Sequence, residues 1–101
     1  MEEQAHAVVL DVSRYRPAAG RRDEMLEEMK KIAEHANQAD GCFGAQVCVS
    51  NSDKESLIAV SRWRSRASLD KFSSDVRSMA SRDKLTRLLD GHAQHEHLTP
   101  V

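Results

Sequence analysis

Three histidines near the carboxyl terminus form the densest group of side chains that could do acid–base or metal chemistry. They are His92, His95 and His97, and the last two share one face if this segment is a strand, because strand side chains alternate. Two imidazoles at that spacing can bind one metal ion, but a third ligand would have to come from His6, His35 or a partner subunit. We therefore expect no metal site. We expect a solvated or dimer-edge cluster; alternatively, one of these histidines, for which we take His95, is the general base for a phenol.

The single tryptophan and the arginines beside it form a second candidate group. Trp63 could stack on a flat molecule, and the guanidinium of Arg62 or Arg64 could stabilise a phenolate. Because adjacent strand residues point to opposite faces, only one of Trp63 and Arg62 can line a given pocket. Each also has a structural explanation, with the indole packed under helices and the arginines in solvent. Tyr15 could hydrogen-bond a substrate or simply cap the core.

Composition narrows the class of protein. The chain has 101 residues, for which we expect one domain over 1–101, and its 15 basic and 16 acidic residues nearly cancel. No basic stripe is interleaved with aromatics, so we expect no nucleic-acid partner. No apolar run approaches the ~20 residues that span a bilayer, and the amino-terminal apolar run is too short for a signal peptide. Cys42 and Cys48 would lie on one strand face about 20 Å apart, too far to pair. We therefore expect a cytoplasmic protein with two free thiols and no membrane partner.

The apolar pattern predicts the element order β-α-β-β-α-β. Its segments are a strand over 6–15, a helix over 21–39, a hairpin turning at 51–54, a helix that Ser65 begins and that a polar break at 73–75 interrupts, and a strand over 92–98. This order is the ferredoxin-like α+β plan, with helices on one face of a four-stranded antiparallel sheet. The hairpin is apolar on both faces. One face can be covered by the chain's own helices, so the other predicts a second copy of the chain, as in a homodimer.

The hairpin region resembles the antibiotic biosynthesis monooxygenase family. The resemblance is carried by Gly41-Cys42-Phe43-Gly44, by Arg62-Trp63 at the end of the second hairpin strand, and by Ser65 with a helix through Leu69. It implies a dimeric α+β barrel with a pocket between sheet and helices in each subunit. It also implies oxygenation of a quinol-like or polycyclic aromatic molecule without metal or organic cofactor. On this basis we expect three catalytic residues, Trp63, Arg62 and His95, and three substrate-binding residues, Tyr15, Phe43 and Phe72.

The chain also departs from the family pattern. Many members have a histidine nine residues after the tryptophan, where this chain has Phe72, and quinol-oxidising members have an asparagine where it has Ala59. The haem-degrading branch needs an asparagine on the first strand and a histidine on the later helix, and both are missing, so we do not expect haem degradation. Two alternatives stay open. One is a non-catalytic small-molecule binding or dimerisation module, which a purely apolar pocket would favour, and the other is a small-metabolite isomerase.

Overall fold

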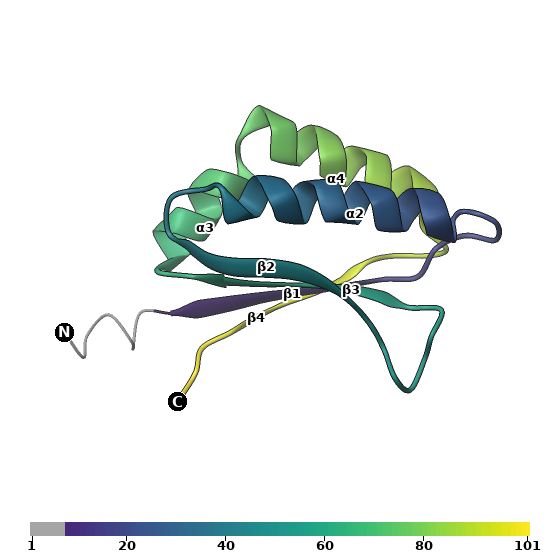
Figure 1. Cartoon of the computed structure of the whole chain (residues 1–101), viewed down its shortest axis with the longest axis horizontal. Helices are drawn as coiled ribbons and strands as arrows, with labels where there is room; N and C mark the ends of the chain where they lie inside the picture. Colours follow the sequence, from purple (N-terminus) through teal and green to yellow (C-terminus); the bar gives the residue numbers. More distant parts are fainter. Residues whose placement is uncertain (1–7) are drawn as a thin grey trace.

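The computed structural model describes residues 8–101 and confirms the ferredoxin-like α+β plan (Figure 1). The elements are β1 (Val9–Tyr15), α2 (Arg22–Asn37), β2 (Cys42–Val49), β3 (Leu57–Trp63), α3 (Arg66–Ser73), α4 (Val76–Leu88) and β4 (Gln94–Leu98). His6 and Ala7, which we expected in the first strand, lie outside the described residues. Within those residues no helix is both long and apolar enough to cross a membrane.

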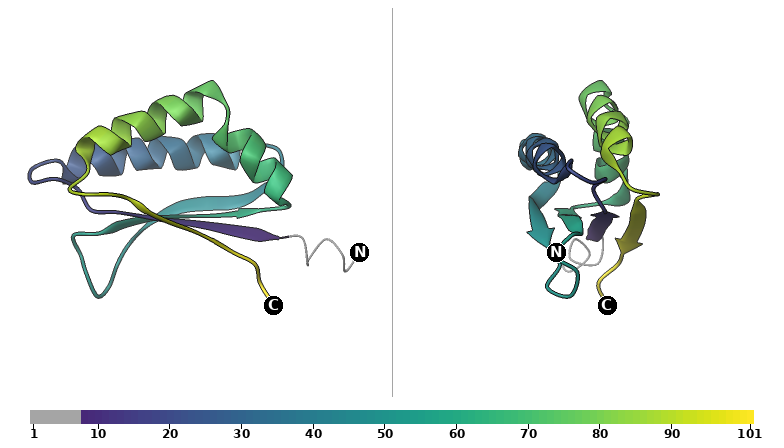
Figure 2. Two further views of the ribbon diagram at one scale, coloured as in Figure 1. Left: turned by 180° about the vertical axis from the view of Figure 1, so that it is seen from behind. Right: turned by 90° about the vertical axis from the view of Figure 1, so that its right-hand side faces the viewer.

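The four strands form one antiparallel sheet in the order β2-β3-β1-β4. The predicted hairpin is therefore confirmed as β2 and β3, and the final strand returns to pair with β1. All three helices lie on the same face of the sheet, as the end-on view in Figure 2 shows. Because of this strand order, β1 lies inside the sheet with β3 on one side and β4 on the other.

Local sequence signals account for the helix boundaries. The Ser65 side chain accepts a hydrogen bond from the Ser68 backbone N–H at 3.1 Å, which caps α3. At the predicted polar break, Asp75 accepts from the Ser78 backbone N–H at 2.7 Å and caps α4. At Gly41 φ is +87°, and an added Cβ would lie 2.4 Å from Ser68 Oγ. Only glycine fits this close approach between the end of α2 and the start of α3.

The restart of the helix at Asp75 changes which side chains of α4 are buried. The sequence spacing predicts one apolar stripe that begins with Val76 and Met79 and continues through Leu85 and Leu88. Leu85 and Leu88 are buried as expected, together with Ser78, but Val76 and Met79 are 84% and 54% exposed. This part of the prediction is wrong because a capped restart turns the helix, so the buried stripe does not continue from α3 into α4.

A β-bulge separates the two cysteines. Cys42 lies opposite Trp63, but Gly44 lies opposite Arg62, so β2 carries one extra residue, Phe43, at this point. Cys42 packs against the buried cluster around Trp63, whereas Cys48 pairs with Ile58 on the other face of the sheet. Our expectation that both thiols share a face is therefore wrong, because the extra residue reverses the alternation.

The sheet face that points away from the helices is apolar at its centre. Leu10, Val12 and Ile58 alternate with residues that face the helices, and they are only partly buried. None of the described elements covers them, as Figure 2 shows. We call this surface, which also includes Val60, Cys48 and Leu98, the open face.

Candidate functional site

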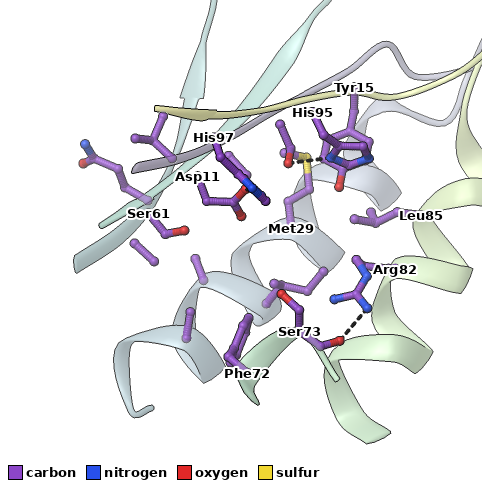
Figure 3. Close-up of a pocket in the computed structure, with 18 residues that line it drawn as sticks. Asp11, Tyr15, Met29, Ser61, Phe72, Ser73, Arg82, Leu85, His95 and His97 are labelled. Carbon is purple, nitrogen blue, oxygen red and sulfur yellow. Dashed lines mark hydrogen bonds and ion pairs between the residues drawn. The ribbon is translucent and has the colours of Figure 1, made fainter. Parts of the chain in front are cut away.

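A cavity of about 360 Å³ lies between the sheet and the helices (Figure 3). Its apolar walls come from α2 and α3 and include Met29, Ile32 and Phe72. Polar residues of the strands and of α3 and α4 also line it; they are Asp11, Ser13, Tyr15, Gln46, Ser61, Ser73, Arg82, His95 and His97. The cavity is thus a mostly apolar slot with one polar floor, which is the usual form of a small-molecule site.

The polar floor follows from strand alternation and register. Asp11, Ser13 and Tyr15 are every second residue of β1, so all three point toward the helices. In the β1–β4 pairing, Asp11 lies opposite His97 and Ser13 lies opposite His95. Each polar residue in the middle of β1 therefore meets a histidine of β4.

Both histidines are held by these neighbours. His95 Nδ1 lies 2.8 Å from the Ser13 hydroxyl oxygen, and His97 Nε2 lies 3.1 Å from Asp11 Oδ1. A carboxylate beside Nε2 favours the tautomer that carries its proton there and leaves Nδ1 able to accept one. The two residues are exposed, so the β4 edge is the solvent-accessible side of the cavity.

Tyr15 closes one end of the polar floor. Its ring meets the His95 ring edge to face, with centroids 6.0 Å apart, and the residue is only 6% exposed. Burial raises the pKa of Tyr15 above its ordinary value, although the Ser13 hydroxyl and the Arg82 charge partly offset this effect. At neutral pH the phenol is therefore a neutral hydrogen-bonding group.

Three of the six residues predicted from the sequence meet at this cavity. Tyr15, Phe72 and His95 line it. Trp63 is fully buried behind Phe72, with the two rings 5.1 Å apart, and its indole N–H donates to the Ser61 hydroxyl at 2.8 Å. The predicted catalytic role of Trp63 stays a prediction.

The other two predicted residues do not line the cavity. Arg62 is exposed and alternates with Trp63, so its side chain is on the face of the sheet opposite the helices. Phe43, the extra residue of the β-bulge, is 57% exposed. The catalytic role expected for Arg62 and the substrate-binding role expected for Phe43 stay predictions. Within one chain, neither side chain reaches the cavity.

Sequence reasoning missed six polar residues of the site, Asp11, Ser13, Gln46, Ser61, Ser73 and Arg82. The signal for Asp11 and Ser13 was polar residues at every second position of an otherwise apolar strand. The signal for Arg82 was a charged residue at helical spacing between two buried residues, Ser78 and Leu85. Such residues on a covered face are unusual and favour a functional site.

Of the two candidate third metal ligands within this chain, the one that the structure describes, His35, does not lie with the β4 histidines. His35 Nε2 pairs instead with Asp75 Oδ2 at 2.9 Å, between α2 and the start of α4. His6 lies outside the described residues. Across residues 8–101, no three histidine, cysteine, aspartate or glutamate side chains are grouped so that they could hold a metal ion.

Comparison with known proteins supports the family resemblance. A family model described as antibiotic biosynthesis monooxygenase matches residues 9–77. No curated protein matches the chain.

Solved structures share the fold. Rv0793 from Mycobacterium tuberculosis is 21% identical, with a TM-score of 0.86 over 93% of this chain and 95% of that one. A conserved protein from Methanosarcina mazei Go1 is 17% identical, with a TM-score of 0.90 over 98% of each chain. A protein from Caulobacter crescentus, provisionally named an antibiotic biosynthesis monooxygenase, is 14% identical, with a TM-score of 0.86 over 99% of this chain and 95% of that one. At these identities the likeness shows the fold alone.

Proposed function

The chain belongs to the antibiotic biosynthesis monooxygenase family, and from that premise we propose that it is a cofactor-independent monooxygenase that oxidises a quinol-like or polycyclic aromatic molecule. The observation that carries this proposal is the cavity with two histidines on one side, one hydrogen-bonded to Ser13 and the other paired with Asp11, and apolar side chains on the other. Its volume of about 360 Å³ is within the range of small-molecule sites. A flat ring system would lie between Phe72 and the sheet, with a hydroxyl group toward β4.

Cofactor-free oxygenation asks little of the protein, because the substrate anion itself reduces oxygen. A general base takes the phenolic proton, and the phenolate transfers one electron to O₂, which gives a substrate radical and superoxide. The two recombine through a new C–O bond to a peroxide. Loss of water then breaks the O–O bond and the C–H bond at the same carbon, so that a ring C–H of the phenol becomes C=O and all four electrons reach O₂. No other reductant is needed.

The polar floor offers the general base. His95 is the residue we expected in this role, and its Nε2 is not used by the bond to Ser13. His97 is a second candidate, because Asp11 can stabilise the imidazolium that forms when Nδ1 takes a proton. The apolar walls keep water from the anion, which strengthens its interactions within the cavity.

We also propose that the protein works as a homodimer that buries the open face. Leu10, Val12 and Ile58 are partly exposed at the centre of this face, and no described helix covers them. A second copy packed sheet to sheet would bury these side chains, and it would also cover Arg62 and Phe43. We place this dimer in the cytoplasm, where free thiols such as Cys42 and Cys48 persist.

An isomerase is the second candidate function. The pair of His97 and Asp11, with His95 beside it, could move a proton from one atom of a small metabolite to another. Such a reaction would not consume O₂. A binding module without activity is less well supported, because the cavity is not lined by apolar residues alone.

Oxygen uptake separates these functions. We would measure it for metal-stripped protein with hydroquinones, anthrones and naphthols, comparing wild type with His95→Ala and His97→Ala. Loss of a general base should lower the rate about 10²- to 10⁴-fold. His92→Ala is the matched control, since this histidine is exposed and does not line the cavity. If no compound exceeds its uncatalysed rate, the monooxygenase proposal fails, and turnover without oxygen would establish the isomerase.

A further inference from the structure

We propose that the molecule bound in the cavity is an aromatic carboxylate, and that Arg82 binds its carboxylate group. This inference rests on the proposed function, because it takes the cavity to be the substrate site. It deepens that function by naming the chemical class of the substrate: a hydroxyarene with a carboxylate at one end.

The side chain of Arg82 extends from α4 into the cavity (Figure 3). It lies on the helix face that also carries the buried residues Ser78 and Leu85, and it is itself partly buried. One terminal nitrogen, Nη2, donates to the Ser73 carbonyl oxygen at 2.5 Å. This bond anchors one edge of the guanidinium and leaves other N–H groups directed at the cavity.

The protein does not supply an anion for this guanidinium within residues 8–101. The acidic residue next to it, Asp83, pairs instead with Arg87 at 2.7 Å. The carboxylate that lines the cavity, Asp11, lies beside His97. A partly buried charge without a partner is costly, so a bound anion would be strongly favoured there.

Carboxylate suits the position better than other anions of this size. A guanidinium binds a planar carboxylate through two parallel N–H bonds, whereas a phenol reaches the site uncharged at neutral pH. The remaining polar groups, His95 and His97, lie on β4, across the cavity from α4. A ring system between these two walls would present its carboxylate to Arg82 and its hydroxyl to the histidines.

Arg82 and Tyr15 both line the cavity, so the guanidinium and the phenol can contact one ligand. The positive charge of Arg82 acts to lower the pKa of the Tyr15 phenol, although burial dominates and raises it. Because Tyr15 stays neutral, it does not provide the missing negative charge.

Calorimetric binding of a matched pair of ligands tests the inference. The pair is a hydroxynaphthoate and the naphthol that lacks its carboxylate, measured at neutral pH with the full chain. Wild type should bind the naphthoate at least about tenfold more tightly. Arg82→Gln should lose about tenfold to a hundredfold in affinity for the naphthoate but keep its affinity for the naphthol. The affinity of Arg82→Lys for the naphthoate should lie between those of wild type and Arg82→Gln. Lysine keeps the positive charge but cannot form the two parallel hydrogen bonds of a guanidinium.

Arg87→Gln is the matched control, since Arg87 lies on the same helix but is exposed and outside the cavity. The inference is overturned if Arg82→Gln binds the naphthoate as wild type does, if it weakens both ligands equally, or if wild type binds neither. Oxygen uptake with uncharged hydroquinones is scored separately. Uptake without a carboxylate preference overturns this inference alone, and a carboxylate preference without uptake supports it and contradicts the monooxygenase.

Discussion

The covered face of β1 presents Asp11, Ser13 and Tyr15 to the helices, whereas the open face presents Leu10 and Val12. A sheet with helices on one side normally shows the reverse, with apolar residues inward and polar residues in solvent. The difference teaches that polar and apolar residues of one strand can be placed for two different purposes. The covered face has the cavity in which we propose that a ligand binds, and the open face is the surface that the proposed dimer would bury.

Polar residues of the covered face have polar partners, through hydrogen bonds at Ser13 and Ser61 and through the pairing of Asp11 with His97, so their burial is tolerated. Ser13 and Asp11 have histidine partners, and the Ser61 hydroxyl accepts from Trp63. Burying such groups without partners would be costly. The arrangement preserves a set of polar atoms beside an apolar slot. Both buried hydrophobic clusters contribute to the cavity wall, one through Met29 and Leu85 and the other through Ala36 and Phe72.

The largest expected effect on stability comes from replacing Trp63. This residue faces the helices, whereas its neighbour in β3, Arg62, faces the other way. Trp63→Ala should lower the free energy of unfolding by about 3–5 kcal/mol, because it empties a fully buried position. Arg62→Ala should cost less than about 1 kcal/mol, as its side chain is exposed. Urea titration followed by circular dichroism measures both. Equal losses would mean that we have assigned the two faces of β3 incorrectly.

A charge on the open face should separate the proposed dimer. Val12→Asp would bury a carboxylate without a partner at the centre of the interface, and we expect it to weaken dimerisation by about 3 kcal/mol or more. Sedimentation equilibrium gives the dissociation constant. Val76→Asp makes the same change at a residue that is 84% exposed on α4, and it should leave the dimer intact. A wild-type chain that is monomeric at micromolar concentration would contradict the proposal for this face.

The helices over the covered face include α4, which carries Arg82 and is capped at its N-terminus by Asp75. Asp75→Ala should cost about 1 kcal/mol, the usual effect of losing an N-cap. The Ser78 backbone N–H, and secondarily His35, hold the pKa of Asp75 below its ordinary value. The stabilisation is therefore present above about pH 4 and is lost as the pH falls through the lower pKa of the folded state.

Urea titrations at neutral and strongly acidic pH check this prediction. The free energy of unfolding of wild type should exceed that of Asp75→Ala by about 1 kcal/mol at neutral pH, and this difference should become smaller in acid. A difference that is the same at both pH values would mean that the carboxylate charge at Asp75 does not contribute.

The smallest expected effect is a shift in the ionisation of Tyr15, the single tyrosine of the chain. Because burial raises its pKa, the absorbance change of the phenolate should have its midpoint above pH 10 in the folded protein and at about pH 10 in denaturant. Stability from this group is present below about pH 10 and is lost as the pH rises through the folded-state pKa. Tyr15→Phe should remove that alkaline loss. A titration midpoint at or below pH 10 in the folded protein would contradict the burial of this phenol away from water.

Much of the fold was predictable because its signals are local. The hairpin followed from alternation on either side of a polar turn, and the caps at Ser65 and Asp75 followed from residue type. Part of the site was predictable for the same reason, since Tyr15 and His95 stood out as chemical groups on strands. Phe43 was not placed correctly relative to its neighbours, because the β-bulge that displaces it depends on pairing with β3.

The sequence by itself determined the order of the elements, the family resemblance and some of the side chains that could do chemistry, Tyr15 and His95 among them. Spacing along one segment is enough for these, because helix and strand periodicity act over a few residues. Only the tertiary structure decided that Trp63 rather than Arg62 faces the helices, that Asp11 meets His97, and that Arg82 enters the cavity. The physical reason is that these depend on which strands pair, in what register, and which face the helices cover, and all three are set by contacts between residues far apart in the chain.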